Sequence, residues 1–245
     1  MTLLTHEWIV PDWPAGAGVR AFVTTRAGGF SLGPYASFNL GTRVGDDPAA
    51  VERNRELLRS VLPAHPLWLH QVHGADVVDA AAANALSRAD GAVARTRRTV
   101  CAVLTADCLP VLLAARDGSA VGIAHAGWRG LAAGVIEATV ARMGVARGAV
   151  LAWLGPGIGP GAYEVGRDVY AALVAGSPSA ASAFAPRGDG KFLVNLYELA
   201  RQRLAASGVT AVTGGGFCTY TDAERFYSYR RDRTTGRFAS LVWID

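Results

Sequence analysis

The stretch CAVLTADCLPVLLAARDGSAVGIAHAG, residues 101–127, decides the fold. Its first part, 101–115, consists of two strand-like apolar halves around a short polar break. The RDGS sequence at 116–119 turns the chain. The apolar run that follows, 120–127, predicts another buried strand. Buried strands joined by such short connections indicate a sheet at the centre of the molecule.

Strands and helices alternate on both sides of this stretch. Apolar, β-branched runs predict strands, and apolar residues at helical spacing predict helices. The expected strands are VRAFVTT (19–25), two strands within PLWLHQVHGADVVDA (66–80), AVLAWLG (149–155) and KFLVNL (191–196). The expected helices are PAAVERNRELLRSVL (48–62), GLAAGVIEATVARMG (130–144), VGRDVYAALVAG (165–176) and YELARQRLAASG (197–208). We expect Asp47 to cap the first helix, Gly144 to end the second, and 226–244 to form a hairpin about a Thr-Gly turn.

The composition is that of a globular protein. Of the 245 residues, 51% are hydrophobic and 18% are charged, which suffices for a sizeable core. No linker-like composition divides the chain. We therefore predict a single α/β domain over residues 1–245, with at least one mixed sheet.

Charge and cysteine usage narrow the class of protein. The formal net charge is +4, and the arginine clusters at 95–98 and 230–233 lack the density of a nucleic-acid-binding arm. No uncharged apolar run reaches membrane-spanning length, and Glu7 and Asp12 lie where a signal peptide needs an apolar core. Three cysteines without disulfide-like spacing suit a reducing compartment. We expect a cytoplasmic monomer with neither nucleic acid nor membrane as a partner.

Three potential metal ligands stand at the ends of apolar strands: His73 in HQVHG, Cys108 in TADCLP and His125 in HAGWRG. Their spacings match no local metal motif, but neighbouring strands can bring distant residues together where ligands gather. Two imidazoles and a thiolate are good zinc ligands, and an open fourth position is typical of catalytic zinc. Asp107 is expected beside them, fixing the tautomer of a histidine.

A second interpretation stays open at this point. Free cysteines are among the most buried residue types and often pack as small hydrophobes, and a histidine near a turn is often an ordinary loop residue. Cys101, in TVCAVLT, is assigned to the core, and Cys218 is undecided. We assign no role to His6 and His65.

Several segments near these residues suit substrate binding. The long Gly-rich loop after the first strand is expected to be ordered and offers Arg26 and Ser31 to an oxyanion. Trp128 either stacks on a planar ring or packs its helix onto the sheet, and Arg129 suits an anion. The alternating glycines and prolines of 155–166 do not fit a dinucleotide loop and predict a rigid loop for close backbone approach.

Together these segments resemble one bacterial family over almost the whole chain. The segments are TTRAGGFSLGPYASFNLG (24–41), QVHGADV (71–77), TADCLPVLLA (105–114), HAGWRGLAAGV (125–135), GPGIGPGAYEVG (155–166) and CTYTDAERFYSYRRDRTTGR (218–237). The family has carried three labels: polyphenol oxidase (a laccase-like copper protein), purine nucleoside phosphorylase and peptidoglycan editing factor. The chain departs from the family at two positions, with Arg43 where relatives often carry His, and His70 where they usually carry another polar residue.

The resemblance implies a fold, a metal and an activity. The implied fold is an α/β sandwich with mixed sheets, distantly similar to the catalytic domain of cytotoxic necrotizing factor. The implied metal is zinc on His73, Cys108 and His125. The implied activity is phosphorolysis of adenosine, inosine and methylthioadenosine, with some adenosine deamination, so that purine nucleosides and phosphate are the expected partners.

The working hypothesis gives each residue a role. Zinc activates a water or orients phosphate for attack on a purine nucleoside. Asp107 shuttles the proton in deamination. Substrate binding is assigned to Arg26, Ser31, Asn39, Arg43 and Arg129.

Copper is an alternative occupant of the site, because Cu²⁺ outcompetes Zn²⁺ for most such ligand sets. Multicopper oxidation is nevertheless rejected. The chain has five histidines in total, with no His-x-His pair for a trinuclear cluster. Its two methionines, Met1 and Met143, lie outside the motifs and offer no axial ligand.

Two rival functions remain. One is a metal-free cysteine hydrolase that removes muropeptide precursors carrying serine in place of alanine, with Cys108 as nucleophile and His73 or His125 as base. The other is a non-enzymatic protein that binds a metal or a partner.

Overall fold

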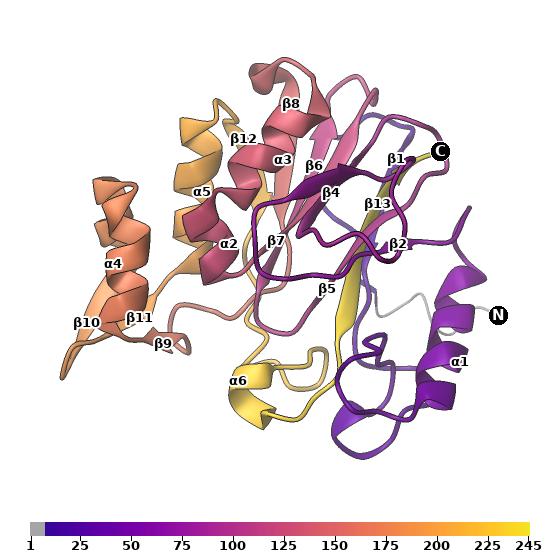
Figure 1. Ribbon diagram of the computed structural model, residues 1–245, viewed down its shortest axis with the longest axis horizontal. Helices are drawn as coiled ribbons and strands as arrows, with labels where there is room; N and C mark the ends of the chain where they lie inside the picture. Colours follow the sequence, from indigo (N-terminus) through magenta and orange to yellow (C-terminus); the bar gives the residue numbers. More distant parts are fainter. Residues whose placement is uncertain (1–7) are drawn as a thin grey trace.

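The computed structural model describes residues 8–245, whose strands form three sheets (Figure 1). The six-stranded sheet has the order β12 (Ala211–Gly214), β8 (Val150–Leu154), β6 (Leu109–Ala115), β7 (Val121–Ala126), β4 (Gly91–Ala94) and β3 (Val77–Asp79). The four-stranded sheet has the order β1 (Val19–Val23), β13 (Phe238–Ile244), β5 (Cys101–Thr105) and β2 (Leu67–Trp68). A small sheet joins β10 (Phe184–Gly188), β11 (Lys191–Val194) and β9 (Glu164–Val165).

Helices cover the outer faces of the two larger sheets. The helices are α1 (Pro48–Arg59), α2 (Trp128–Ala133), α3 (Val135–Met143), α4 (Arg167–Ala175), α5 (Leu196–Ala206) and α6 (Tyr229–Asp232). In Figure 1, α2, α3 and α5 lie on one side of the six-stranded sheet, and α1 lies beyond the four-stranded sheet. The small sheet and α4 lie outside α2 and α5. As expected, Asp47 caps α1 through its side chain, 3.0 Å from the Ala49 nitrogen.

The alternation of side chains along the strands builds three hydrophobic cores. On β13, Phe238 and Val242 point into the core between the two large sheets, whereas Leu241 and Trp243 point into the core under α1. A third core lies between the six-stranded sheet and α2, α3 and α5. Strands buried on both faces read as continuous apolar runs, which is why residues 101–127 predicted them correctly.

The predicted α/β class with a mixed sheet is confirmed. In the six-stranded sheet β12–β8 and β3–β4 are parallel, and the other pairs are antiparallel. The likeness to the cytotoxic necrotizing factor domain stays a prediction. No helix of residues 8–245 is long and apolar enough to cross a membrane.

The helix expected over 130–144 is two helices, so that prediction is wrong in part. Gly134 has φ 89° and both ends α2 and begins α3. Only glycine enters this left-handed region without steric cost, and its helix-compatible neighbours concealed the break. Gly144 ends α3 at φ 69°, as predicted.

The hairpin expected over 226–244 is also wrong. Only its second half is a strand, because β13 already pairs with β1 on one edge and β5 on the other. The first half buries Phe226 and Tyr227 and then forms the single turn of α6, capped where the Ser228 hydroxyl accepts a hydrogen bond from the Arg231 nitrogen.

Candidate metal centre and substrate cavity

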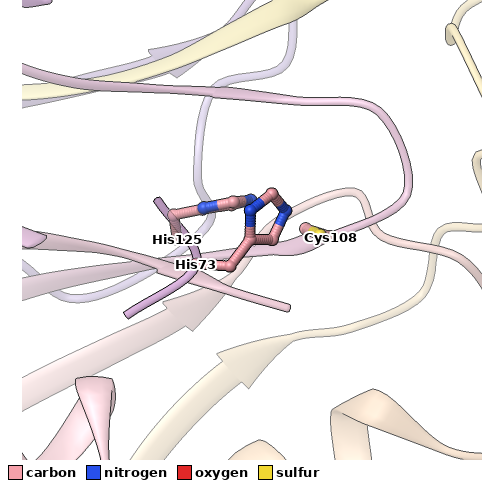
Figure 2. A group of neighbouring side chains, drawn as sticks. All are labelled: His73, Cys108 and His125. Atoms are coloured by element: carbon pink, nitrogen blue, oxygen red, sulfur yellow. The ribbon is translucent and has the colours of Figure 1, made fainter. Parts of the chain in front are cut away.

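Two crossings between the large sheets carry His73 and Cys108. The chain passes from β2 to β3 through His73, and from β5 to β6 through Cys108. Because β2 and β5 are parallel neighbours, both crossings leave the four-stranded sheet at the same end. His125 lies near the end of β7, opposite Pro110 at the start of β6. The topology therefore brings three segments distant in sequence to one place, as Figure 2 shows.

The donor atoms of His73, Cys108 and His125 form a compact group, within 4.8 Å of one another. The two imidazole centroids are 4.8 Å apart and the rings are inclined by 64°. His125 is buried, Cys108 half-buried and His73 exposed, so the group extends from the core to the surface. Two nitrogens and one thiolate at these separations fit a zinc site that keeps one position open. Across residues 8–245 this is the one such cluster of three or more ligating side chains.

The electrostatics of the group favour metal binding. Burial raises the pKa of the Cys108 thiol, but the charge of His125 and hydrogen bonds from both histidines outweigh it and lower that pKa below its ordinary value. Burial lowers the pKa of His125, yet Cys108 and Asp90 raise it above its ordinary value. The pair thus favours a thiolate, the form of cysteine that binds metals.

Asp107 does not orient a histidine, contrary to expectation. Its Oδ1 accepts a hydrogen bond from the Thr219 hydroxyl at 2.7 Å, and its Oδ2 accepts one from the Arg230 backbone nitrogen at 2.6 Å. The partner of His125 is Asp90, with 2.8 Å between Asp90 Oδ1 and His125 Nδ1. Asp90 was missed because an Asp-Gly pair before a strand gives only a turn signal.

The group opens into a cavity of about 770 Å³, within the range of small-molecule sites. Five arginines line it: Arg43, Arg55, Arg129, Arg230 and Arg237. Asp107 is the one carboxylate among the described residues that line the cavity. The cavity is therefore electropositive and suits an anionic ligand.

Sequence reasoning identified two of these arginines, Arg43 and Arg129, both exposed at the cavity. The structure adds three. Arg55 reaches it from α1 with its guanidinium 4.6 Å from the Trp68 ring centroid. Arg230 and Arg237 come from the segment that was expected to be a hairpin, so its wrong assignment concealed them.

Arg237 is held rigidly near Cys108. Its backbone nitrogen donates to Asn39 Oδ1 at 2.8 Å, and its Nη1 donates to the carbonyls of Thr235 and Gly236. Burial lowers the pKa of its guanidinium, while the neighbouring Cys108 and Asp107 raise it. No carboxylate of residues 8–245 forms an ion pair with it. A half-buried cation without an ion pair is suited to binding an anion from solution.

Arg26, predicted to bind substrate, does not line the cavity. Its Nε donates to the Ala36 carbonyl at 2.9 Å and its Nη1 to the Ala223 carbonyl at 3.1 Å. The guanidinium also lies over the Tyr227 ring. Arg26 thus ties the long loop to the segment before α6.

Ser31 and Asn39 were also assigned to substrate and are instead buried in the loop. The Ser31 hydroxyl accepts a hydrogen bond from Asn54 Nδ2 at 3.0 Å. The Asn39 Nδ2 donates to the Gly41 carbonyl, and the Asn39 Oδ1 accepts hydrogen bonds from the backbone nitrogens of Gly41 and Arg237. These bonds hold in place the backbone that carries Arg43 and Arg237, as predicted for an ordered loop.

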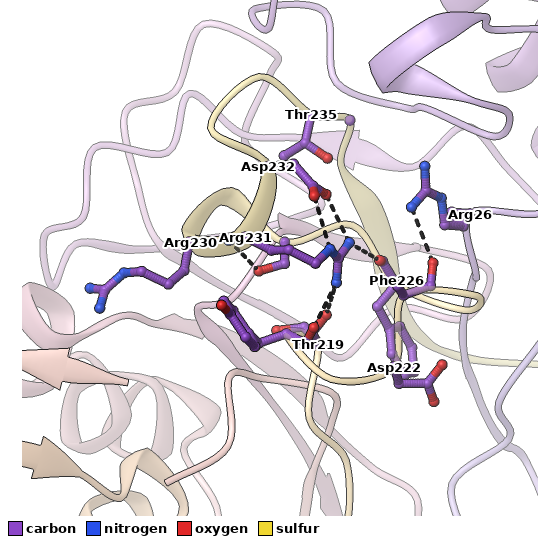
Figure 3. Close-up of polar contacts among 12 residues, drawn as sticks. Arg26, Thr219, Asp222, Phe226, Arg230, Arg231, Asp232 and Thr235 are labelled. Atoms are coloured by element: carbon purple, nitrogen blue, oxygen red, sulfur yellow. Dashed lines mark hydrogen bonds and ion pairs between the residues drawn. The ribbon is translucent and has the colours of Figure 1, made fainter. Parts of the chain in front are cut away.

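Arg231 organises the segment that supplies Tyr229 and Arg230. Figure 3 shows its guanidinium among the backbone carbonyls of the surrounding loop. It donates to the carbonyls of Thr219, Tyr220 and Phe226 and pairs with Asp232. The side chain is therefore occupied in shaping the loop.

Aromatic rings complete the cavity lining. Trp128, Tyr163, Tyr229 and Trp68 all contribute. Trp128 packs against the core under α2 and also lines the cavity, and its stacking on a planar ring stays a prediction. The aromatic rings can stack on a planar ligand.

Glycines around the site let the backbone pass close to the two cysteine side chains, the kind of close backbone approach that the sequence suggested for residues 155–166. A Cβ on Gly127 would meet Cys108 Sγ at 2.7 Å, and one on Gly159 would meet the Cys218 side chain at 2.9 Å. Cys218 accepts a hydrogen bond from the Gly159 nitrogen at 3.2 Å. Cys101 is fully buried in the core, as assigned, whereas His65 is exposed. His6 lies outside the described residues.

The chain is similar to known proteins over nearly its full length. Residues 20–245 match the family model described as multi-copper polyphenol oxidoreductase laccase. A purine nucleoside phosphorylase of Pseudomonas aeruginosa is 56% identical, covering 98% of this chain and 99% of its own. The purine nucleoside phosphorylase YfiH of Escherichia coli K12 is 53% identical, covering 96% of this chain and 98% of its own.

Solved structures are similar too. A Neisseria meningitidis protein described by the family model DUF152 has 50% identity and a TM-score of 0.95, covering 98% of this chain and 99% of its own. YlmD from Geobacillus stearothermophilus has 32% identity and a TM-score of 0.89, covering 97% of this chain and 96% of its own.

Proposed function

This chain belongs to the multi-copper polyphenol oxidoreductase laccase family, and from that premise we propose that it is a zinc-dependent purine nucleoside phosphorylase. The observation that carries the proposal is a His-Cys-His donor group opening into an arginine-lined cavity. The names of the curated relatives at 53–56% identity support it. The proposed substrates are phosphate with adenosine, inosine or methylthioadenosine.

In the proposed reaction a phosphate oxygen attacks C1′ of the nucleoside. The C1′–N9 bond breaks, its electron pair leaves with the purine, and a proton neutralises the base. The products are the free purine and ribose 1-phosphate, or 5-methylthioribose 1-phosphate when the substrate is methylthioadenosine. Zinc bound by His73, Cys108 and His125 would supply a Lewis acid at the open side of the group.

The arginines supply the phosphate site in this proposal. Arg237 is the first choice, because it is fixed near Cys108 and has no ion pair within residues 8–245. Arg129 and Arg43 reach the same cavity from other segments. Arginine binds phosphate through two parallel N–H donors, which fixes orientation as well as charge.

The aromatic side chains are proposed to hold the base. Trp128 adjoins Arg129, whose guanidinium lies 4.4 Å from the Trp128 ring centroid. Tyr229 is half exposed at the cavity next to Arg230. Flat rings beside cations can hold a purine and a phosphate next to each other.

We keep adenosine deamination as a proposed side activity. In that reaction a water oxygen replaces the 6-amino group of adenine, and ammonia leaves. Asp107 is the proposed proton carrier, because it lines the cavity and immediately precedes Cys108. Its two existing hydrogen bonds leave lone pairs on both oxygens.

The rival functions have less support. A cysteine hydrolase would need Cys108 free of metal, and alkylation tests this directly, because bound zinc protects a thiolate. A blue-copper centre usually has an axial methionine, and the one methionine of residues 8–245, Met143, is fully buried in the core under α3.

Product analysis tests the proposal. Protein of known zinc content is incubated with adenosine, with and without phosphate, and the products are separated by chromatography. We expect adenine and ribose 1-phosphate, formed only with phosphate. Inosine without adenine would make the protein a deaminase, and no turnover at full zinc occupancy would contradict both activities.

A further inference from the structure

The Asp90 side chain contacts the segments that carry two of the three donors. It is 0% exposed, and its Oδ1 lies 2.8 Å from His125 Nδ1. Its Oδ2 accepts hydrogen bonds from the backbone nitrogens of Val72 at 3.0 Å and Gly74 at 2.7 Å. These two residues flank His73, so one carboxylate spans both histidine ligands.

The backbone reinforces this connection. The His125 nitrogen donates to the Asp90 carbonyl at 2.7 Å, and the Asp90 nitrogen donates to the Asp76 carbonyl at 3.0 Å. His73 itself has φ 61°, a left-handed conformation that is costly for a residue with a side chain. The two bonds to Asp90 Oδ2 stabilise that conformation on both sides of the ligand.

The carboxylate also determines where His125 carries its hydrogen. Asp90 Oδ2 already accepts the two backbone hydrogen bonds, and Oδ1 lies within hydrogen-bond distance of His125 Nδ1. An ionised carboxylate can only accept. A neutral His125 therefore keeps its hydrogen on Nδ1 and presents the lone pair of Nε2 as its free ligand atom.

We propose that Asp90 is a positioning residue, which sets the tautomer of His125 and the backbone of His73 so that both imidazoles present metal-binding nitrogens together. This inference rests on the proposed metal centre. It explains how two ligands from unconnected segments keep a fixed separation. Asp107, the carboxylate that the sequence motifs offer, does not perform this task, since its oxygens bond Thr219 and Arg230.

The substitution Asp90→Asn tests the proposal with almost no change in size. The Asp90 carboxylate can accept hydrogen bonds through both oxygens, one from His125 and the other from the His73 segment. An asparagine amide has one oxygen to accept with, and its NH₂ group must face the other contact. Either His125 or the His73 segment must lose its acceptor. We expect the zinc Kd to rise about 10- to 100-fold, measured on the full chain by competition with a chromophoric chelator.

Asp79→Asn is the matched control. Asp79 lies on β3 of the same sheet but pairs with Arg95 at the surface, so its zinc Kd should match that of the wild type. An unchanged zinc Kd in a folded Asp90→Asn variant would overturn the positioning role alone. Failure of the wild type to bind zinc would overturn the proposed function as well.

A second measurement needs no variant. In zinc-loaded wild-type protein labelled with ¹⁵N-histidine, NMR should show a protonated Nδ1 and a zinc-bound Nε2 for His125. A hydrogen on Nε2 would overturn the proposal, even if Asp90→Asn did not fold.

Discussion

Arg237 illustrates how single residues acquire a role here. Nothing in its local sequence marks it, yet Asn39, Thr235 and Gly236 hold it against the cavity near Cys108. The residues predicted to bind substrate fall into two groups, those that line the cavity and those that hold the neighbouring loop in place. Arg43 and Arg129 reach the cavity, whereas Arg26, Ser31 and Asn39 maintain the loop beside it.

Arg237→Gln should weaken phosphate binding. A charge-assisted hydrogen bond contributes about 1.5–3 kcal/mol, so we expect the KM for phosphate to rise about 10- to 100-fold. The KM for inosine should change much less. Initial rates at varied phosphate concentration measure the effect.

Arg225→Gln is the control for this prediction. Arg225 pairs with Asp222 and lies outside the cavity lining, so its loss should leave the KM for phosphate unchanged. Equal behaviour of the two variants would show that Arg237 does not bind phosphate.

At the scale of elements, the break at Gly134 separates α2 from α3 and lets each pack in its own direction. Gly134→Ala puts a side chain at φ 89° and should lower the free energy of unfolding by about 1–2 kcal/mol. Gly176, at the end of α4, has φ −86° and open space for a Cβ. Gly176→Ala should therefore leave stability unchanged or raise it by up to about 1 kcal/mol.

Urea unfolding of both glycine variants measures these differences. Equal stability of the two would mean that the left-handed geometry at Gly134 is not needed for the fold.

The elements that the sequence predicted well are those with a strong local pattern. The strands within 101–127 are buried on both faces. The helix α1 has an N-cap residue, Asp47, and apolar residues at helical spacing. Features set by tertiary contacts were missed. The 226–237 segment buries Phe226 and Tyr227 instead of forming a strand, since both edges of β13 are occupied.

The donor residues of the candidate metal site could be predicted from the sequence, but the residue that orients them could not. Residue type and position at strand ends made His73, Cys108 and His125 candidates, and the family resemblance implied that they bind zinc. The structure brings them together. Asp90 was not a candidate, because its contacts with His125 and with the His73 segment depend on the three-dimensional pairing of β4 and β7. Hydrogen bonds across such sequence distances leave no local signal.

At the scale of the whole molecule, the candidate metal site links the two large sheets. Two of the connections between these sheets, β2–β3 and β5–β6, run through its ligands His73 and Cys108. Zinc that binds only the folded chain should therefore raise the melting temperature. At 100 times its Kd it adds about 2.7 kcal/mol, which corresponds to about 5–10 °C for a chain of this size.

Differential scanning calorimetry with chelator and with added zinc measures this shift. Cys108→Ala should melt at the same temperature in both. A zinc-dependent shift that persists in the variant would mean that zinc stabilises the fold from another site.

The most direct test of the central claim combines metal content with activity. Metal-depleted wild-type protein and Cys108→Ala receive increasing zinc, and phosphate-dependent cleavage of inosine is followed by chromatography. The account predicts that the wild-type rate rises in proportion to zinc and levels off at one zinc per chain, while the variant stays inactive. Phosphorolysis by Cys108→Ala, or by the wild type without zinc, would contradict it.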